Sequence, residues 1–326
     1  MRRQIGRTGS IAVVLALAGV AVAVAVAVGP TSEIKGPATV SAPAQRMLST
    51  SIAGCPIFPA DNAWNTRVDM APVRARSAET IAKIQVIGSD NLHPDFGENP
   101  AYGIPFVVVA PDQPGVSITY TGAGDESDPG PFPIPAQAPV ESGSDRHVLV
   151  LQQVSCRLYE LFAGSRSGAG WTAYSGAAFD LRSNALRPLG WTSADAAGLP
   201  ILPGLVRFDE VASGRINHAI RVTFAQTRNK YILPATHFAS SNTNIDLPPM
   251  GLRLRLKAGY EVGGLTGQAR VIAVALQQYG FIVADNGSNW YFQGAPNPGW
   301  VDSDLDQLKS IPGTAFEVVD TGAALP

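Results

Sequence analysis

Short runs of β-branched and aliphatic residues recur along the chain, and most are bounded by glycine, proline or asparagine. Runs of this kind, broken by turn residues, are typical of β-strands. They predict strands at 106–110, 116–120, 147–151, 157–163, 217–224, 230–233, 252–257, 281–284, 290–293 and 315–319. We expect 106–110 to form a hairpin with 116–120, because only a turn with two prolines and a glycine separates them. The runs 147–151 and 157–163 should form a second pair.

In the run LRLRLK (252–257), leucine alternates strictly with arginine and lysine. Successive side chains of a strand point to opposite faces of its sheet. The alternation therefore predicts one face buried in the core and one face in water.

Apolar residues spaced three or four apart, the helical period, occur in fewer segments. They predict helices at 77–87, 266–279 and 303–310. The first two begin with a Ser or Thr in the N-cap position and end before a glycine. The third has acidic residues in its first turn and a lysine in its last, which suits the helix dipole.

Many short strands, 33 glycines, 26 prolines and few helices predict a mainly β protein. We expect a single β-sandwich or jelly-roll-like domain with a few decorating helices and long loops. The chain shows no internal repeat of the kind that a propeller requires. The predicted loops at 121–146 and 164–206 are longer than most connections, and such loops are usually functional.

The N-terminal segment differs from the rest of the chain. Within residues 1–30, three arginines precede an uncharged apolar run at 11–29, the layout of a signal peptide. The run is also long enough for an uncleaved membrane anchor. Residues 31–53 are rich in Pro, Ser and Ala and predict a disordered tether, which leaves 54–326 as the globular domain. We expect the protein to be secreted, or anchored to the outer face of the cytoplasmic membrane by this segment alone.

Charge and cysteine content restrict the partners and the compartment. Without residues 1–30, which hold three arginines and no acid, the formal charge falls from -2 to -5. This modest acidity argues against nucleic acid as a partner. Both cysteines, Cys55 and Cys156, lie in the exported part, where an oxidising compartment favours a disulfide over two free thiols.

The loop DESDPGPFPIP (125–135) is the first candidate site. Its three acids, Asp125, Glu126 and Asp128, could provide the acid and base of glycosidic bond cleavage, and its four prolines would stiffen the loop. The same acids could bind calcium, although the spacing is not that of an EF-hand loop. They could also form an ordinary solvated loop. We expect no other cofactor.

Three histidines are further candidates. His147 follows Asp145 by two residues, so a shared strand face would let the carboxylate orient the imidazole as a general base. His218 suits either a catalytic base or a buried, hydrogen-bonded core position. His237 is a candidate for substrate binding. The histidines lack the close spacing of known zinc motifs, so no metal site is predicted.

The second half of the chain adds candidates of several kinds. Asp209 is a possible catalytic acid, and Arg221 could clamp a substrate carboxylate. In the turn ADNGSNW (284–290), Asp285 could be catalytic, and polar side chains beside aromatic rings suit a sugar site. The expected substrate-binding residues there are Asn286, Ser288, Trp290 and Trp300. A structural ion pair, a plain hairpin turn and core tryptophans are the alternatives.

The order of the segments CPIFPADNAWN, YGIPFVVV, DESDPGPFPIP, DRHVLVLQ, GWTSADAAGLPILPGLVRFDEV and ADNGSNW resembles that of a group of secreted, signal-bearing proteins without an assigned function. The resemblance covers about residues 54–322. It implies secretion and a single domain, and it implies no activity for any residue.

These features predict an enzyme that cleaves an extracellular polysaccharide. A glycoside hydrolase would use two of the carboxylates named above. A lyase on a uronic-acid polymer would instead use Arg221 to neutralise the substrate carboxylate and His147 or His218 as base. The alternative class is a non-catalytic carbohydrate-binding or cell-envelope structural domain. Serine-hydrolase, nucleotide-binding and metalloprotease motifs are absent from the sequence.

Overall fold

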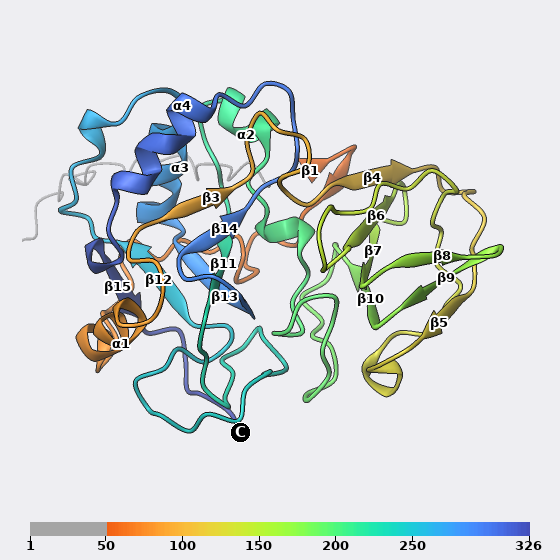
Figure 1. Cartoon of the computed structure of the whole chain (residues 1–326), viewed down its shortest axis with the longest axis horizontal. Coiled ribbons are helices and arrows are strands. Elements are labelled where there is room, and N and C mark those ends of the chain that lie inside the picture. Colours follow the sequence, from red (N-terminus) through yellow and green to blue (C-terminus); the bar gives the residue numbers. More distant parts are fainter. Residues whose placement is uncertain (1–50) are drawn as a thin grey trace, which may run out of the picture. The chain divides into compact units, whose positions relative to one another are not determined.

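A mixed sheet of six strands dominates the computed structural model, which describes residues 51–326 (Figure 1). The strand order is β15 (Phe316–Val319), β12 (Arg253–Leu256), β13 (Phe281–Asn286), β11 (Ile220–Phe224), β14 (Tyr291–Gln293) and β3 (His93–Asp95). β11 runs parallel to β13, and β14 runs parallel to β3. The other neighbours are antiparallel.

The helices pack mainly on this sheet. The α-helices are α1 (Ser77–Gln85), α2 (Phe208–Ala212), α3 (Gly267–Gln278) and α4 (Asp302–Leu305), and the 3₁₀ helices are η1 (Gly124–Glu126), η2 (Leu202–Gly204), η3 (Val262–Gly264), η4 (Asp306–Ser310) and η5 (Gly313–Ala315). α3 contacts β12, α1 contacts β15, and α2 and α4 contact α3. All three predicted helices are present, the third as α4 followed by η4.

The ends of α3 show how the helix is held. The N-cap Thr266 does not cap the helix with its own side chain. Instead, Asp304 Oδ2 accepts a hydrogen bond from the backbone N–H of Gln268 at 2.9 Å, so an acid from α4 satisfies the positive end of α3. Gly280, just after the helix, has φ of 67°, the left-handed conformation predicted for it.

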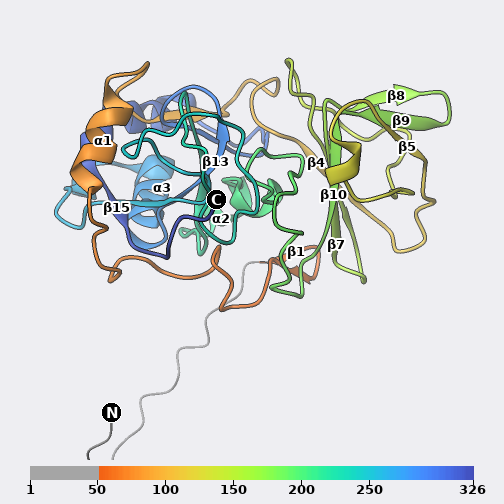
Figure 2. The ribbon, with the colours of Figure 1, turned by 90° about the horizontal axis from the view of Figure 1, so that it is seen from below.

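Two smaller sheets make up the other part of the structure (Figure 2). The four-stranded sheet has the order β10 (Ser175–Asp180), β7 (Arg157–Phe162), β6 (Val148–Gln152) and β4 (Phe106–Val109). The three-stranded sheet has the order β5 (Ile118–Tyr120), β9 (Gly170–Ala173) and β8 (Ser165–Ser167), and β1 (Ser51–Ile52) pairs with β2 (Cys55–Pro56). The predicted pairing of β6 with β7 is confirmed.

Two predicted hairpins are wrong. β4 pairs in parallel with β6, and β5 pairs in parallel with β9, because Val116 at the turn pairs with Phe132 of the proline-rich run and leads the chain away from β4. Likewise β13 and β14, which flank the Asn-Gly turn, do not pair with each other. β11 lies between them and pairs with both.

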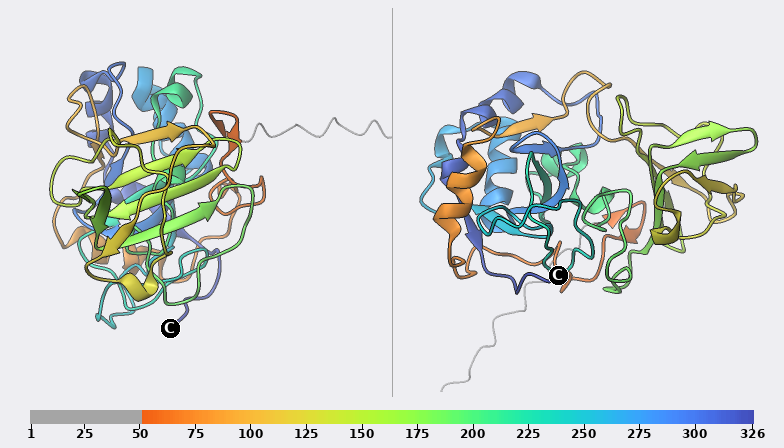
Figure 3. Two further views of the ribbon diagram at one scale, coloured as in Figure 1. Left: turned by 90° about the vertical axis from the view of Figure 1, so that its right-hand side faces the viewer. Right: turned by 60° about the horizontal axis from the view of Figure 1, so that its bottom comes forward.

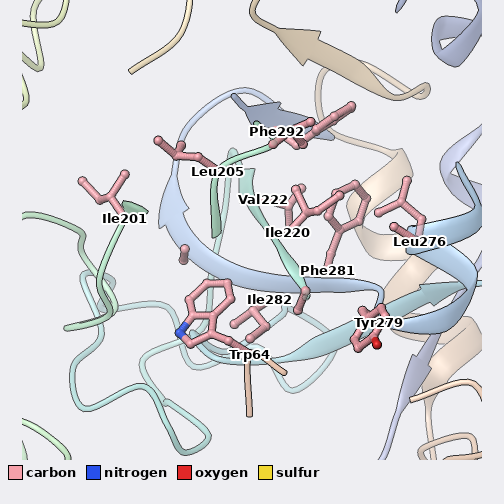
Figure 4. Packing of buried hydrophobic residues seen from close by; sticks show 14 of the residues in the cluster. Trp64, Ile201, Leu205, Ile220, Val222, Leu276, Tyr279, Phe281, Ile282 and Phe292 are labelled. Carbon is pink, nitrogen blue, oxygen red and sulfur yellow. The ribbon is translucent and has the colours of Figure 1, made fainter. Parts of the chain in front are cut away.

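The four-stranded sheet lies between the larger sheet and the three-stranded sheet (Figures 2 and 3). Its strand β6 is buried on both faces because a hydrophobic core packs against each. On β6, Leu149 and Leu151 face the main core, while Val148 and Val150 face a smaller core under the three-stranded sheet. The main core continues to the six-stranded sheet and α3. Figure 4 shows part of it, with Ile220 and Phe281 of the sheet near Leu276 of α3.

β12 departs from its predicted solvent face. Its leucines are buried as expected, but Arg253 and Arg255 are also only 3% and 9% exposed. Arg253 donates to the carbonyl oxygens of Ala63 and Tyr279, and Arg255 pairs with Glu317 at 2.8 Å. Burial lowers the pKa of Arg253 to about 9. The arginines fasten the segment 63–71 over the sheet instead of facing water.

The mainly β fold of a single unit with few short helices is confirmed; a sandwich or jelly-roll topology stays a prediction. Cys55 and Cys156 form the predicted disulfide, which fits an oxidising compartment. Within residues 51–326, no helix combines the length and apolar character needed to cross a membrane. The predicted signal or anchor at 1–30 and most of the tether lie outside the described residues.

Candidate functional site

A pocket of about 360 Å³ lies where the four-stranded sheet meets the loops of the larger sheet. Its walls come from five segments: η1, the facing ends of β7 and β10, the loop at 192–196, the loop after β11, and the end of β13. Besides Tyr174, the lining residues with polar or ionisable side chains are Glu126, Ser175, Thr192, Ser193, Asp195, His237 and Asp285. Three of the predicted site residues, Glu126, His237 and Asp285, therefore come together here.

A β-bulge places Asp285. The register of β11 and β13 shifts after Val222, so that Thr223 lies opposite Asp285 and Ala284 is the extra residue. Bulges re-aim side chains and are common next to active sites. The carbonyl oxygen of Ala284 accepts a hydrogen bond from the N–H of Ala197 at 3.0 Å, which ties the strand to the 192–196 loop. Asp285 thus reaches the pocket with its side chain 25% exposed.

Behind Asp285 lies a buried ion pair. Arg221 donates from Nε to Asp195 Oδ2 at 3.1 Å and from Nη2 to Asp195 Oδ1 at 2.7 Å, a bidentate contact. Gln293 Oε1 accepts a third bond from Arg221. The side chains of Arg221 and Asp195 are 2% and 0% exposed. Arg221 thus forms the structural ion pair that was the alternative to a substrate clamp, and its partner is a carboxylate of the protein.

The two carboxylates meet at one nitrogen of Arg221. Asp285 Oδ2 lies 4.0 Å from Nη2, the atom that Asp195 binds at 2.7 Å. Asp195 binds Nε and Nη2 of Arg221 and Gln293 binds Nη1, so Asp285 lies near the guanidinium without a hydrogen bond to it. Burial, and then the neighbouring Asp195 carboxylate, raise the pKa of Asp285 well above its ordinary value, while Arg221 opposes the shift. Burial and the neighbouring Asp195 carboxylate thus favour the protonated form of Asp285.

His237 and Glu126 face each other across the pocket, with His237 Nε2 3.8 Å from Glu126 Oε2. His237 Nδ1 lies 2.7 Å from the carbonyl oxygen of Ala196. Because a carbonyl can only accept, Nδ1 carries a proton, and Nε2 of the neutral ring has its lone pair toward the pocket. Glu126 Oε2 accepts a bond from the N–H of Thr192 at 3.1 Å, which holds its carboxylate in place.

Two aromatic side chains form one wall. Phe162 at the end of β7 and Tyr174 before β10 meet edge to face, with ring centroids 5.8 Å apart. Tyr174 is 48% exposed, so part of its ring is free to contact a ligand. A partly exposed ring beside carboxylates offers an apolar surface next to hydrogen-bonding groups.

His147 is not part of the pocket lining; it binds a residue of the lining from the buried side. Nδ1 lies 2.5 Å from Glu141 Oε2, and Nε2 lies 3.1 Å from the carbonyl oxygen of Ala194. Burial alone would lower the pKa of His147, but the hydrogen bond and charge of Glu141 outweigh it and raise the pKa. Both nitrogens are occupied, and Glu141 takes the place predicted for Asp145. His147 thus positions the residue next to Asp195.

His218 is a core residue with 0% exposure. Its Nε2 lies 3.0 Å from Glu210 Oε2 and its Nδ1 lies 2.8 Å from the carbonyl oxygen of Ala219. Arg207 also binds Glu210, at 3.0 Å. His218 therefore takes the buried, hydrogen-bonded core position that was the alternative to a catalytic base. Neither ring nitrogen is free to act as a base.

The other acids of the prediction lie apart from the pocket lining. Asp128 accepts a bond from the N–H of Ala178 at 2.8 Å and pairs with Arg187, so it braces the proline-rich loop. Asp125 is exposed on η1. Asp209 lies on α2 with its side chain 67% exposed, next to Arg207.

The residues predicted to line a sugar site beside the Asn-Gly turn take other positions. Trp290 and Trp300 are core side chains, 0% and 2% exposed, with their indole nitrogens bound to Gln85 and Ala295. Asn286 bonds with Thr227 at 2.6 Å and with the carbonyl oxygen of Ala239, while Ser288 is exposed. The aromatic surface at the pocket comes instead from the Phe162 and Tyr174 pair.

Sequence reasoning missed Asp195, Glu141 and the aromatic wall. Asp195 is a single acid in a stretch of small residues, SADAAG (193–198), and its isolation among them is the one signal that the sequence offered. Within residues 51–326, no group of three or more His, Cys, Asp or Glu side chains is arranged to hold a metal ion.

The chain was compared with protein-family models, with curated proteins and with solved structures. None of the three comparisons finds a match.

Proposed function

We propose that the protein is a secreted hydrolase that cleaves a glycosidic bond of a neutral polysaccharide in the pocket of Asp285. The observation that carries the proposal is the pairing of Asp285 with the buried Asp195–Arg221 ion pair. Glycoside hydrolysis needs a carboxyl group that keeps its proton near neutral pH, and a second group that acts on water or on the sugar.

Asp285 would be the general acid. Its raised pKa keeps a proton available, and its partly exposed position at the pocket wall allows it to donate that proton to the glycosidic oxygen. Arg221 holds the Asp195 carboxylate with two hydrogen bonds, so Asp195 acts through Asp285 and is a positioning residue.

Glu126 and His237 would supply the base. The fixed tautomer of His237 directs a lone pair at Nε2 into the pocket, where it can take a proton from water, and Glu126 can stabilise the resulting imidazolium. The acid and the base then come from different segments of the pocket lining. Tyr174 would contact the apolar face of a sugar ring.

The charge of the pocket favours a neutral substrate. Its lining contains the acids Glu126, Asp195 and Asp285 and no lysine or arginine. Arg221 is not free to neutralise a substrate carboxylate, because Asp195 and Gln293 occupy it. A uronic-acid polymer, as a lyase would require, would meet the Glu126 carboxylate here and no lysine or arginine of the lining. The volume is within the usual range of ligand sites, about 300–1,000 Å³.

The test is a screen of the purified protein against neutral and uronic-acid polysaccharides, with detection of new reducing ends and of ultraviolet-absorbing unsaturated products. Asp285→Asn should lower kcat by about 10²-fold or more and leave substrate binding nearly intact. Asp209→Asn, which removes an exposed carboxylate on α2, is the matched control and should keep full activity.

The remaining outcomes separate the alternatives. Full turnover by Asp285→Asn would contradict the assigned acid. Unsaturated products would identify a lyase. Saturable binding of a polysaccharide without any product, abolished by Tyr174→Ala and unaffected by Asp285→Asn, would identify a non-catalytic binding domain and refute the hydrolase.

A further inference from the structure

A second pocket, of about 460 Å³, lies at the start of α1, away from the residues of the first. Two other parts of the chain complete it: the loop after β11 and the C-terminal tail beyond β15, which meet at this end of the larger sheet (Figure 1). The lining residues with polar or charged side chains are Arg74, Arg76, Thr80, Arg228 and Asp320. Three arginines and one aspartate thus line this one pocket.

Two of the three arginines are neutralised by the protein. Arg74 donates to the carbonyl oxygen of Gly322 at 2.6 Å and lies 3.3 Å from Asp320. Arg76 donates to Asp246 Oδ1 from Nε at 2.9 Å and from Nη2 at 2.5 Å. These contacts pair each charge and hold the two side chains along the pocket wall.

Arg228 is different. Its side chain makes no hydrogen bond and no ion pair with any residue in the described part of the chain, and its Nε is buried without a partner. A guanidinium carries its positive charge at neutral pH, and a buried N–H without an acceptor is unfavourable. The backbone of Arg228 is held by the carbonyl oxygen of Pro248 at 2.9 Å. The pocket therefore carries one positive charge that has no partner in the described part of the chain.

The rest of the lining is apolar. Ile245, Leu247, Pro249 and Leu252 face the pocket, and Ile245 is 58% exposed although it is a large aliphatic residue. An oxyanion at Arg228 would therefore have hydrocarbon beside it. A fully polar anion would leave this surface in water, whereas an anion with an aliphatic body would cover it.

We propose that this pocket binds a small anionic amphiphile, a carboxylate or phosphate on an aliphatic body. Its oxyanion accepts hydrogen bonds from Arg228, and its body covers Ile245. The proposal depends on no feature of the hydrolase pocket, since the two linings share no residue.

The test is titration calorimetry of the purified exported protein with octanoate and with octyl phosphate, which distinguish the two oxyanions. Acetate and inorganic phosphate are the probes without an aliphatic body. Saturable binding of an octyl probe is expected, at least about tenfold tighter than binding of its short counterpart, because the octyl chain buries apolar surface.

Three variants locate the site. Arg228→Gln should weaken binding of the octyl probe about tenfold or more, through loss of a charge-assisted contact. Ile245→Ser, which leaves the charge in place, should weaken the octyl probe and leave the short anion unchanged. Arg215→Gln removes an exposed arginine outside the pocket lining and should bind as the wild type does.

Several results would overturn the proposal. These are the absence of saturable binding, equal affinity for octanoate and acetate and for octyl phosphate and inorganic phosphate, and an equal loss in the Arg215 and Arg228 variants. Association with phosphatidylglycerol vesicles without saturable binding of either octyl probe would instead identify a membrane surface as the partner.

Discussion

The buried carboxyl group of Glu160 should make the stability of the protein depend on pH. Glu160 lies on β7 with 0% exposure and accepts hydrogen bonds from the N–H groups of Ile201 and Leu202, each at 2.9 Å. Burial raises its pKa from 4.5 to about 7, although the two backbone N–H groups favour the ionised form and oppose the shift. The perturbation that tests this is Glu160→Gln, which removes the titrating proton and nearly preserves the shape.

The sign and size follow from linkage. Below about pH 4.5 the carboxyl is protonated in both the folded and the unfolded chain. Between about pH 4.5 and 7 the unfolded chain loses the proton first, so the free energy of unfolding falls as the pH rises. A shift from 4.5 to about 7 corresponds to about 3 kcal/mol in total, lost over this interval.

Glutamine cannot ionise, so the free energy of unfolding of the variant should not show this part of the decrease with rising pH. We expect the free energy of unfolding of Glu160→Gln, relative to the wild type, to rise by about 3 kcal/mol between about pH 4.5 and 7.5. Urea unfolding followed by circular dichroism at several pH values measures the difference. Glu261→Gln, an exposed glutamate before η3, is the matched control and should follow the wild type. A constant difference between Glu160→Gln and wild type over the interval would refute the reasoning.

Two further predictions concern the stability of the fold. Replacing Cys55 and Cys156 by serine should lower the free energy of unfolding by about 4–5 kcal/mol, since the disulfide closes a loop of about 100 residues; unchanged urea midpoints would contradict this. Arg221→Met should cost about 3–5 kcal/mol because it leaves Asp195 buried and unpaired. Adding Asp195→Leu should restore part of the loss in the same assay, and an additive double mutant would contradict a direct pairing.

The strands and helices could be predicted where the signal is local. β6 and β7 pair as expected, because each run carries its own strand pattern and only a short turn separates them. β4 and β5 do not pair, because their partners β6 and β9 lie farther along the chain. Pairing of distant strands depends on contacts that no single window of sequence contains.

The candidate site shows the same division. Residue type alone selected Glu126, His237 and Asp285, which the fold brings to one pocket. The same reasoning selected Asp209, which is exposed on a helix, and His218, which is buried and hydrogen-bonded to Glu210. Carboxylates and imidazoles are alike in sequence, and only their neighbours decide which of them keeps a proton or a free lone pair.

The sequence by itself determined the mainly β composition and the disulfide partners, and residue type indicated Glu126, His237 and Asp285. Tertiary structure alone decided that Arg221 faces Asp195, that the arginines of β12 are buried, and that Arg228 has no partner in the described chain. The physical reason is the distance along the sequence over which each kind of signal acts. Strand and helix signals lie within a few residues, whereas burial and charge pairing join groups that are far apart in the sequence, such as Asp195, Arg221 and Asp285. The acidic loop at 125–135 illustrates both kinds of signal. Its prolines predicted a stiff loop, whereas only the fold placed Glu126 opposite His237.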